Sequence, residues 1–108
     1  MGGLPPALIN EQVNDDRGSF LALPDRIWPD YRVAYEYEGD FHRGKRRYRS
    51  DVHRVERLVD HDWTVVKATG DDLFDRPREL LYRVGSRLAR AGWDGTVREL
   101  RHFVPFGR

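Results

Sequence analysis

The chain has 108 residues, of which 39% are hydrophobic and 34% are charged, and its formal net charge is +1. This length is that of one small domain. The absence of cysteine excludes disulfide bonds, thiolate metal sites and a cysteine nucleophile. No apolar run is long enough to span a membrane and no signal peptide is recognisable, so we expect a cytoplasmic protein that does not contact a membrane.

The N-terminal third of the sequence shows turn residues and short apolar runs. Residues 1–17 have little periodicity and are expected to form an irregular segment or an edge strand. The apolar residues available for that edge strand are Leu8, Ile9 and Val13. Residues 18–25 follow as a strand, with Gly18 as a turn or bulge candidate. Pro24 and Pro29 bracket a turn-like segment, which makes a central strand throughout this stretch unfavourable.

The stretch 31–38 has the two-residue alternation of a strand. One face carries Val33, Tyr35 and Tyr37, and the other carries Ala34, Glu36 and Glu38. Two carboxylates on one strand face repel each other unless a cation compensates them. Asp25 ends the preceding run, so a hairpin would bring three carboxylates to one edge. Such a set is typical of a site for magnesium or manganese.

The period changes at Lys45 to that of a helix, which we expect to end near His61. Its expected apolar face is Tyr48, Val52, Val55 and Val59. Residues 63–69 form a third strand. Thr69 and Asp72 then resemble a capping box that opens a short helical turn.

A final helix is expected to begin at Asp75 and Pro77 and to end at Gly92. Its apolar stripe is Leu81, Val84, Leu88 and Ala91. The resulting order is strand, strand, helix, strand, helix, which predicts an α/β domain over 18–93 with a small mixed sheet. The first two strands should be antiparallel, and the third should return parallel through a right-handed crossover. Residues 94–108 are expected to be a loose tail.

A basic cluster lies beside the acidic strand. Its members are Arg43, Lys45, Arg46, Arg47 and Arg49. The cluster falls at the start of a helix, where the helix dipole disfavours cations. A nucleic-acid backbone would relieve that repulsion, so we expect these residues to contact DNA. The alternative is an ordinary solvated helix face.

Several separated motifs resemble a known family. Asp25 followed by Glu36-x-Glu38 is similar to the signature of the PD-(D/E)XK nuclease superfamily, whose fold is restriction-endonuclease-like. The wider pattern resembles domain of unknown function 559, a family similar to the very-short-patch-repair (Vsr) endonucleases and with many actinobacterial members. It comprises Phe20–Asp25, Trp28–Pro29, Arg32–His42, Arg49–Asp51, Trp63–Val66 and Asp71–Leu73. The resemblance covers roughly residues 8 to 93.

The resemblance implies metal-dependent hydrolysis of DNA phosphodiesters, with Mg²⁺ or Mn²⁺ and no small-molecule cofactor. Asp25 and Glu36 would be metal ligands. Glu38 stands where the superfamily has a lysine, and it would be a further ligand or a proton acceptor. His42 would transfer a proton. Lys67, on the third strand, would restore the missing positive charge.

The chain departs from the family pattern in one respect, and two alternatives to the nuclease function stay open. Members of the family usually have a helix before the first strand, often preceded by a winged-helix domain, and that helix is expected to be missing here. An uncovered apolar sheet face and self-association would follow. The alternatives are a non-catalytic nucleic-acid-binding or regulatory module, resembling the C-terminal half of an antitoxin or transcription factor, and an inactive truncated fragment.

Overall fold

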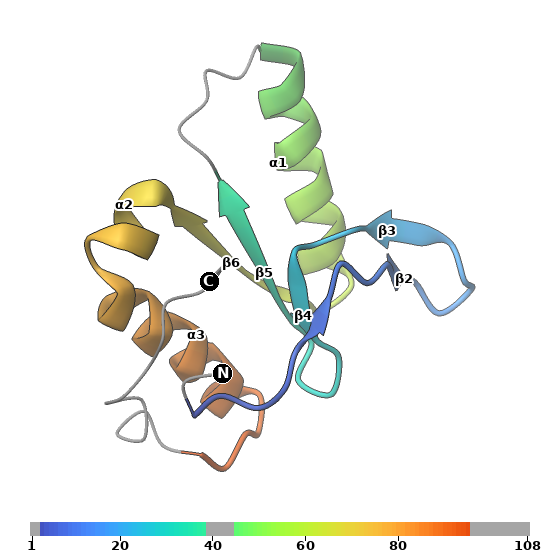
Figure 1. Ribbon diagram of the computed structural model, residues 1–108. Coiled ribbons are helices and arrows are strands. Elements are labelled where there is room, and N and C mark those ends of the chain that lie inside the picture. Colours follow the sequence, from blue (N-terminus) through green and yellow to red (C-terminus); the bar gives the residue numbers. More distant parts are fainter. Residues whose placement is uncertain (1–2, 39–44, 96–108) are drawn as a thin grey trace.

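The computed structural model describes residues 3–38 and 45–95, and for 45–51 it describes the backbone alone (Figure 1). The strands are β1 (Leu8–Ile9), β2 (Val13–Asn14), β3 (Phe20–Ala22), β4 (Arg26–Trp28), β5 (Val33–Glu38) and β6 (Thr64–Thr69). The helices are α1 (Lys45–Asp60), α2 (Gly70–Phe74) and α3 (Pro77–Arg90). The expected loose tail, apart from Asp94 and Gly95, lies outside the described residues.

A small mixed sheet organises the domain, as the sequence predicts. Its strand order is β1-β4-β5-β6. The pair β4–β5 is antiparallel and the pair β5–β6 is parallel. Helix α1 makes the crossover between the two parallel strands. The predicted α/β class and the parallel return of the third long strand are therefore confirmed.

The alternation predicted for β5 is confirmed by the two apolar clusters on either side of the sheet. Val33 and Tyr35 lie in the cluster that contains Leu81 and Val84 of α3. Ala34 lies in the other cluster, with Leu58 of α1. Helix α1 therefore lies over one face, and α2 and α3 lie over the other (Figure 1). The helices cover much of both faces, but Tyr37 of β5 is still 37% exposed, so the uncovered apolar face stays a prediction.

The prediction for the stretch before β5 is wrong in one respect. The expected strand over 18–25 is shortened to β3, which pairs with β2 in a separate two-stranded sheet. The strand that pairs with β5 is β4, in the segment expected to be a turn. Pro24 and Pro29 lie just outside β4, so neither removes an N–H from its ladder. The prolines therefore mark the ends of a short inner strand.

Two tight turns use glycine as the sequence suggests. Gly18, in the turn that joins β2 to β3, has φ +83°, and its N–H donates to the Asp15 carbonyl at 3.0 Å. Gly92 has φ +112° and follows the last turn of α3. Left-handed backbone of this kind favours glycine because it has no Cβ. Both turn predictions are confirmed.

The predicted capping box at α2 is also confirmed. The Asp72 N–H donates to the Thr69 hydroxyl oxygen, and the Thr69 N–H donates to the Asp72 carboxylate. The side chain of Asp72 thereby satisfies a backbone donor that the first helical turn leaves open. Arg83 of α3 donates to the Lys67 carbonyl of β6 at 2.9 Å, which ties α3 to the last strand.

Helix α1 has the predicted length but presents a different face to the sheet. Val52 is 37% exposed and Val59 is 53% exposed, whereas Leu58 is fully buried. Arg54, four residues before Leu58, lies on this inner face and meets Glu36 of β5. The predicted apolar face is therefore wrong for Val52 and Val59, whereas Val55 is half-buried and the side chain of Tyr48 lies outside the described residues. Among the helices described, none combines the length and apolar character needed to cross a bilayer.

Candidate functional site

The three predicted carboxylates lie around the C-terminal end of β5. In α/β sheets, ligands bind most often at the carboxyl ends of parallel strands. Here Glu36 is in register with Lys67, and Glu38 with Thr69 at the end of β6. The candidate site therefore occupies the end of the sheet where such sites are usually found.

Glu36 is a buried carboxylate held by an arginine. Its exposed fraction is only 5%. Arg54 of α1 contacts it, with 3.0 Å between the Arg54 Nη2 and Glu36 Oε2 atoms. A carboxylate in a poorly solvated position requires a compensating charge. The guanidinium of Arg54 supplies that charge, and it joins α1 to the centre of the sheet.

Glu38 lies two residues further along the same face and has a looser partner. The Lys67 ammonium of β6 is 3.9 Å from its Oε1 atom. Both side chains keep about a third of their surface exposed. A pair with this geometry contributes at most about 1 kcal/mol. Glu38 is therefore more easily released from its partner than Glu36 is.

Asp25 is fixed by the backbone of β5. Its Oδ2 atom accepts a hydrogen bond from the Tyr37 N–H at 2.7 Å. Since Tyr37 lies between Glu36 and Glu38 in the sequence, all three carboxylates belong to one end of one strand pair. Asp25 also lines a pocket of about 440 Å³, with Tyr35, Tyr37, Leu73 and Phe74 among its neighbours.

The carboxylates of the candidate site are the right ligand type for a divalent cation, but their arrangement is not that of a complete metal site. Carboxylate oxygens are the ligands that Mg²⁺ and Mn²⁺ prefer. Among the side chains of 3–38 and 52–95, no three acidic or histidine groups gather to hold a metal ion. Two protein cations, Arg54 and Lys67, stand beside the two glutamates. These cations occupy the electrostatic role that a bound metal ion would have.

Tyr35, next to Asp25, has an acid group whose pKa is strongly raised. Burial raises the pKa of its phenol to about 12, and the negative charge of Asp25 adds to that rise. The neutral phenol is therefore the form that the folded protein favours.

This shift predicts a loss of stability in alkali. Because the folded pKa exceeds the usual value of 10.0, the stabilisation is complete below pH 10 and disappears as the pH rises through about 12. Urea unfolding between pH 9 and 12 should show a steeper decline for the wild type than for Tyr35→Phe. The exposed Tyr82 gives the control, since Tyr82→Phe should retain the wild-type slope. Identical slopes for all three proteins would contradict the prediction.

Several predicted site residues cannot be placed. His42 and Arg43 lie outside the described residues, as do the side chains of the rest of the basic cluster. The backbone of α1 nevertheless begins at Lys45, and its first turn contains no acidic residue. The first turn of α1 is therefore basic in sequence, as the DNA-contact prediction requires.

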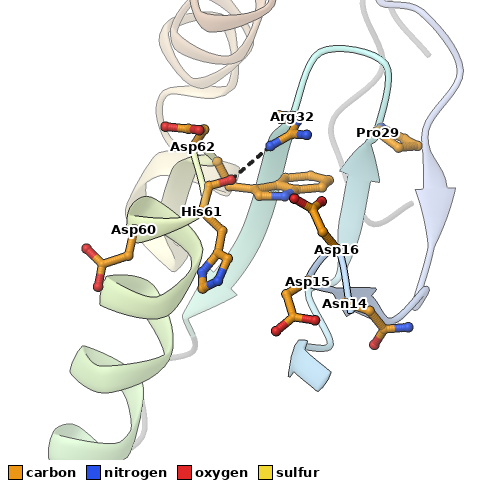
Figure 2. A pocket seen from close by; sticks show the side chains of 9 residues that line it. Asn14, Asp15, Asp16, Pro29, Arg32, Asp60, His61 and Asp62 are labelled. Atoms are coloured by element: carbon orange, nitrogen blue, oxygen red, sulfur yellow. Dashed lines mark hydrogen bonds between the residues drawn. The ribbon is translucent and has the colours of Figure 1, made fainter. Parts of the chain in front are cut away.

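A second pocket, of about 300 Å³, lies at the other end of β5 (Figure 2). It is lined by Asn14, Asp15, Asp16, Pro29, Arg32, Asp60, His61, Asp62 and Trp63. Arg32 donates from Nη1 to the His61 carbonyl at 3.1 Å and thereby links the start of β5 to the turn before β6. The aspartates are exposed or partly exposed, as is usual for a solvated acidic surface.

Comparison with known proteins adds two relatives of undefined function. The uncharacterized proteins MT2308 and Rv2248, from two strains of Mycobacterium tuberculosis, are each 32% identical to this chain over 94 residues. The match covers 86% of this chain and 34% of each relative, so the chain spans about a third of the length of these relatives. No family model matches the chain, and no solved structure matches it.

Arg54 is the functional candidate that sequence reasoning missed. A signal was nevertheless present, because Arg54 and Leu58 are one helical turn apart and so share a face. A helix face that opposes Glu36 needs a cation, and Arg54 is the residue that meets this requirement.

Proposed function

We propose that this chain is a restriction-endonuclease-like domain that hydrolyses nucleic-acid phosphodiesters with the help of a divalent cation. The proposal includes membership of the family that the sequence resembles, domain of unknown function 559, which is similar to the Vsr endonucleases. The observation that carries it is the hydrogen bond from the Tyr37 N–H to Asp25. It holds a third carboxylate at the strand end that bears Glu36 and Glu38.

Each residue of the candidate site has a definable task in such a reaction. Asp25, Glu36 and Glu38 would hold Mg²⁺ or Mn²⁺, which would lower the pKa of a water molecule and neutralise the phosphate. The backbone of β5 keeps Asp25 in place. Lys67 lies close enough to Glu38 to supply positive charge beside the phosphate. His42 would accept or donate the proton, and the basic residues from Arg43 to Arg49 would bind the backbone of the nucleic acid.

The test is divalent-cation-dependent nicking of supercoiled plasmid by the purified chain. Asp25→Asn should lower the nicking rate a hundredfold or more, because charge stabilisation by a bound metal is worth several kcal/mol and each 1.36 kcal/mol is about tenfold in rate. Asp30→Asn changes an exposed aspartate in the β4–β5 turn and should retain the wild-type rate. Absence of nicking by the wild type with either cation would refute the hydrolytic activity.

A second candidate is a non-catalytic nucleic-acid-binding or regulatory module. It is favoured by the pairing of Glu36 with Arg54 and of Glu38 with Lys67, because a site neutralised by the protein itself has less need of a metal ion. In that case the wild type would bind DNA with a strong salt dependence and would not cleave it. Self-association of the chain remains a further proposal, which sedimentation would measure.

A further inference from the structure

We infer that Arg54 is an intramolecular counter-ion that competes with a divalent cation for Glu36. The inference extends the proposed function, since it treats Glu36 as a cation ligand and adds a residue that controls its availability. A bound cation and the Arg54 guanidinium would then be alternative partners of the same carboxylate.

The geometry favours competition because the shared ligand is one buried carboxylate. Glu36 Oε2 already accepts the Arg54 contact at 3.0 Å, and only 6% of the Glu36 side chain is exposed. Two cations beside such a carboxylate would repel each other strongly, since screening by water is weak there. Entry of a metal ion therefore requires the guanidinium to withdraw.

The position of Arg54 makes withdrawal feasible. Its side chain keeps 29% of its surface exposed, so the guanidinium can move toward solvent without crossing the apolar core. It projects from α1, the helix whose first turns carry the basic sequence. A withdrawn Arg54 would therefore join the positive surface expected to face the nucleic-acid phosphates.

Arg57 offers a matched control on the same helix. It carries the same charge three residues later, and its Nε donates to the Leu21 carbonyl at 3.3 Å. That contact involves a backbone carbonyl in place of a carboxylate. Replacement of Arg57 therefore changes the net charge of α1 as much as replacement of Arg54 does, while the Glu36–Arg54 ion pair is retained.

The test compares Mn²⁺ affinity, measured by isothermal calorimetry and by the metal-induced rise in melting temperature. Arg54→Gln should lower the apparent Kd for Mn²⁺ about tenfold, because it removes a competing charge. Arg57→Gln should change the Kd by less than about twofold. The double variant Glu36→Gln with Arg54→Gln should lose the gain in affinity, since the gain acts through Glu36.

These measurements separate competition from a structural role. If Arg54 merely kept Glu36 in place, Arg54→Gln would weaken Mn²⁺ binding, and that result overturns the inference. Equal effects of Arg54→Gln and Arg57→Gln, or no Mn²⁺ binding by wild type and variant alike, overturn it too. Nicking by the wild type is scored separately, so tighter Mn²⁺ binding without nicking would support competition and refute hydrolysis.

A measurement on the wild type keeps the inference testable if Arg54→Gln does not fold. In ¹⁵N-labelled protein, Mg²⁺ should shift the Arg54 Nε–H resonance and accelerate its exchange with water, whereas the Arg57 resonance should stay in place. Saturation with Mg²⁺ that leaves the Arg54 resonance unchanged, or an absence of Mg²⁺ binding, would show that Arg54 and the cation do not compete.

Discussion

Replacement of Trp28 by alanine is expected to lower the free energy of unfolding by about 3–5 kcal/mol. Trp28 is 1% exposed and belongs to the cluster between the sheet and α3, with Leu81 and Leu88. Its indole N–H donates to the Pro5 carbonyl at 2.8 Å. The substitution therefore creates a cavity and removes one of the hydrogen bonds that attach the N-terminal segment.

Urea unfolding would measure this effect, with the midpoint lowered and the slope unchanged. Since small domains have only about 5–15 kcal/mol of stability, this loss would remove a large share of it. Trp63, which is only partly buried, provides the control, and Trp63→Ala should cost clearly less. Equal midpoints for the two variants would show that the cluster around Trp28 is not the main core.

The second large effect is expected at the Glu36–Arg54 pair. Arg54→Ala leaves Glu36 buried and without its 3.0 Å ion-pair contact, which typically costs 3–5 kcal/mol when one member of a buried pair is removed. We expect about 3 kcal/mol, at the lower end of that range, because the Arg54 side chain is partly exposed. The loss should be measurable as a lower urea midpoint near neutral pH.

A compensating double substitution tests the cause of that loss. Glu36→Leu combined with Arg54→Leu removes both charges, and it should restore most of the stability because no buried charge remains. Arg57→Ala should cost less than about 1 kcal/mol, since Arg57 is exposed and surface contacts of this kind contribute little. A double variant as unstable as Arg54→Ala would mean that packing of the arginine stem, and not its charge, stabilises the fold.

Much of the fold follows from local sequence patterns. The alternation over 33–38 predicts correctly which residues of β5 face each layer, because helices cover both sides of the sheet. The capping box of Thr69 and Asp72 and the glycine at position 92 fix the limits of α2 and α3 through backbone hydrogen bonds, which depend only on near neighbours in sequence. Such features can be predicted from the sequence without knowledge of the tertiary structure.

The two errors of prediction have long-range causes. The division of 18–28 into β3 and β4 depends on the pairing of β4 with β5 and on the contact from Tyr37 to Asp25. The rotation of α1 depends on the attraction between Arg54 and Glu36, which are 18 residues apart. A hydrophobic pattern contains no information about which charged residue will be drawn inward, so it favoured Val52 and Val59.

The candidate site was predictable only in part, because its carboxylates follow from local sequence and their partners do not. The sequence indicated that Asp25, Glu36 and Glu38 converge at one edge. In the structure Asp25 accepts a hydrogen bond from the Tyr37 N–H, but among the described side chains no three acidic groups gather to hold a metal ion. Their present partners were not predictable, because Arg54 and Lys67 come from elements that reach β5 only after folding. The cation, the DNA contact and the hydrolytic reaction stay predictions that the experiments above address.

The contact between Arg83 and the Lys67 carbonyl has a consequence for solubility. In the described part of the chain, β6 is the outermost strand on its side of the sheet, and an outermost strand with free carbonyl groups can recruit a strand from another molecule. Arg83 occupies one such carbonyl with a charged side chain. The guanidinium therefore obstructs the pairing of β6 with a strand of another molecule at that point. Helix α3, which carries Arg83, thus covers the core and also hinders aggregation.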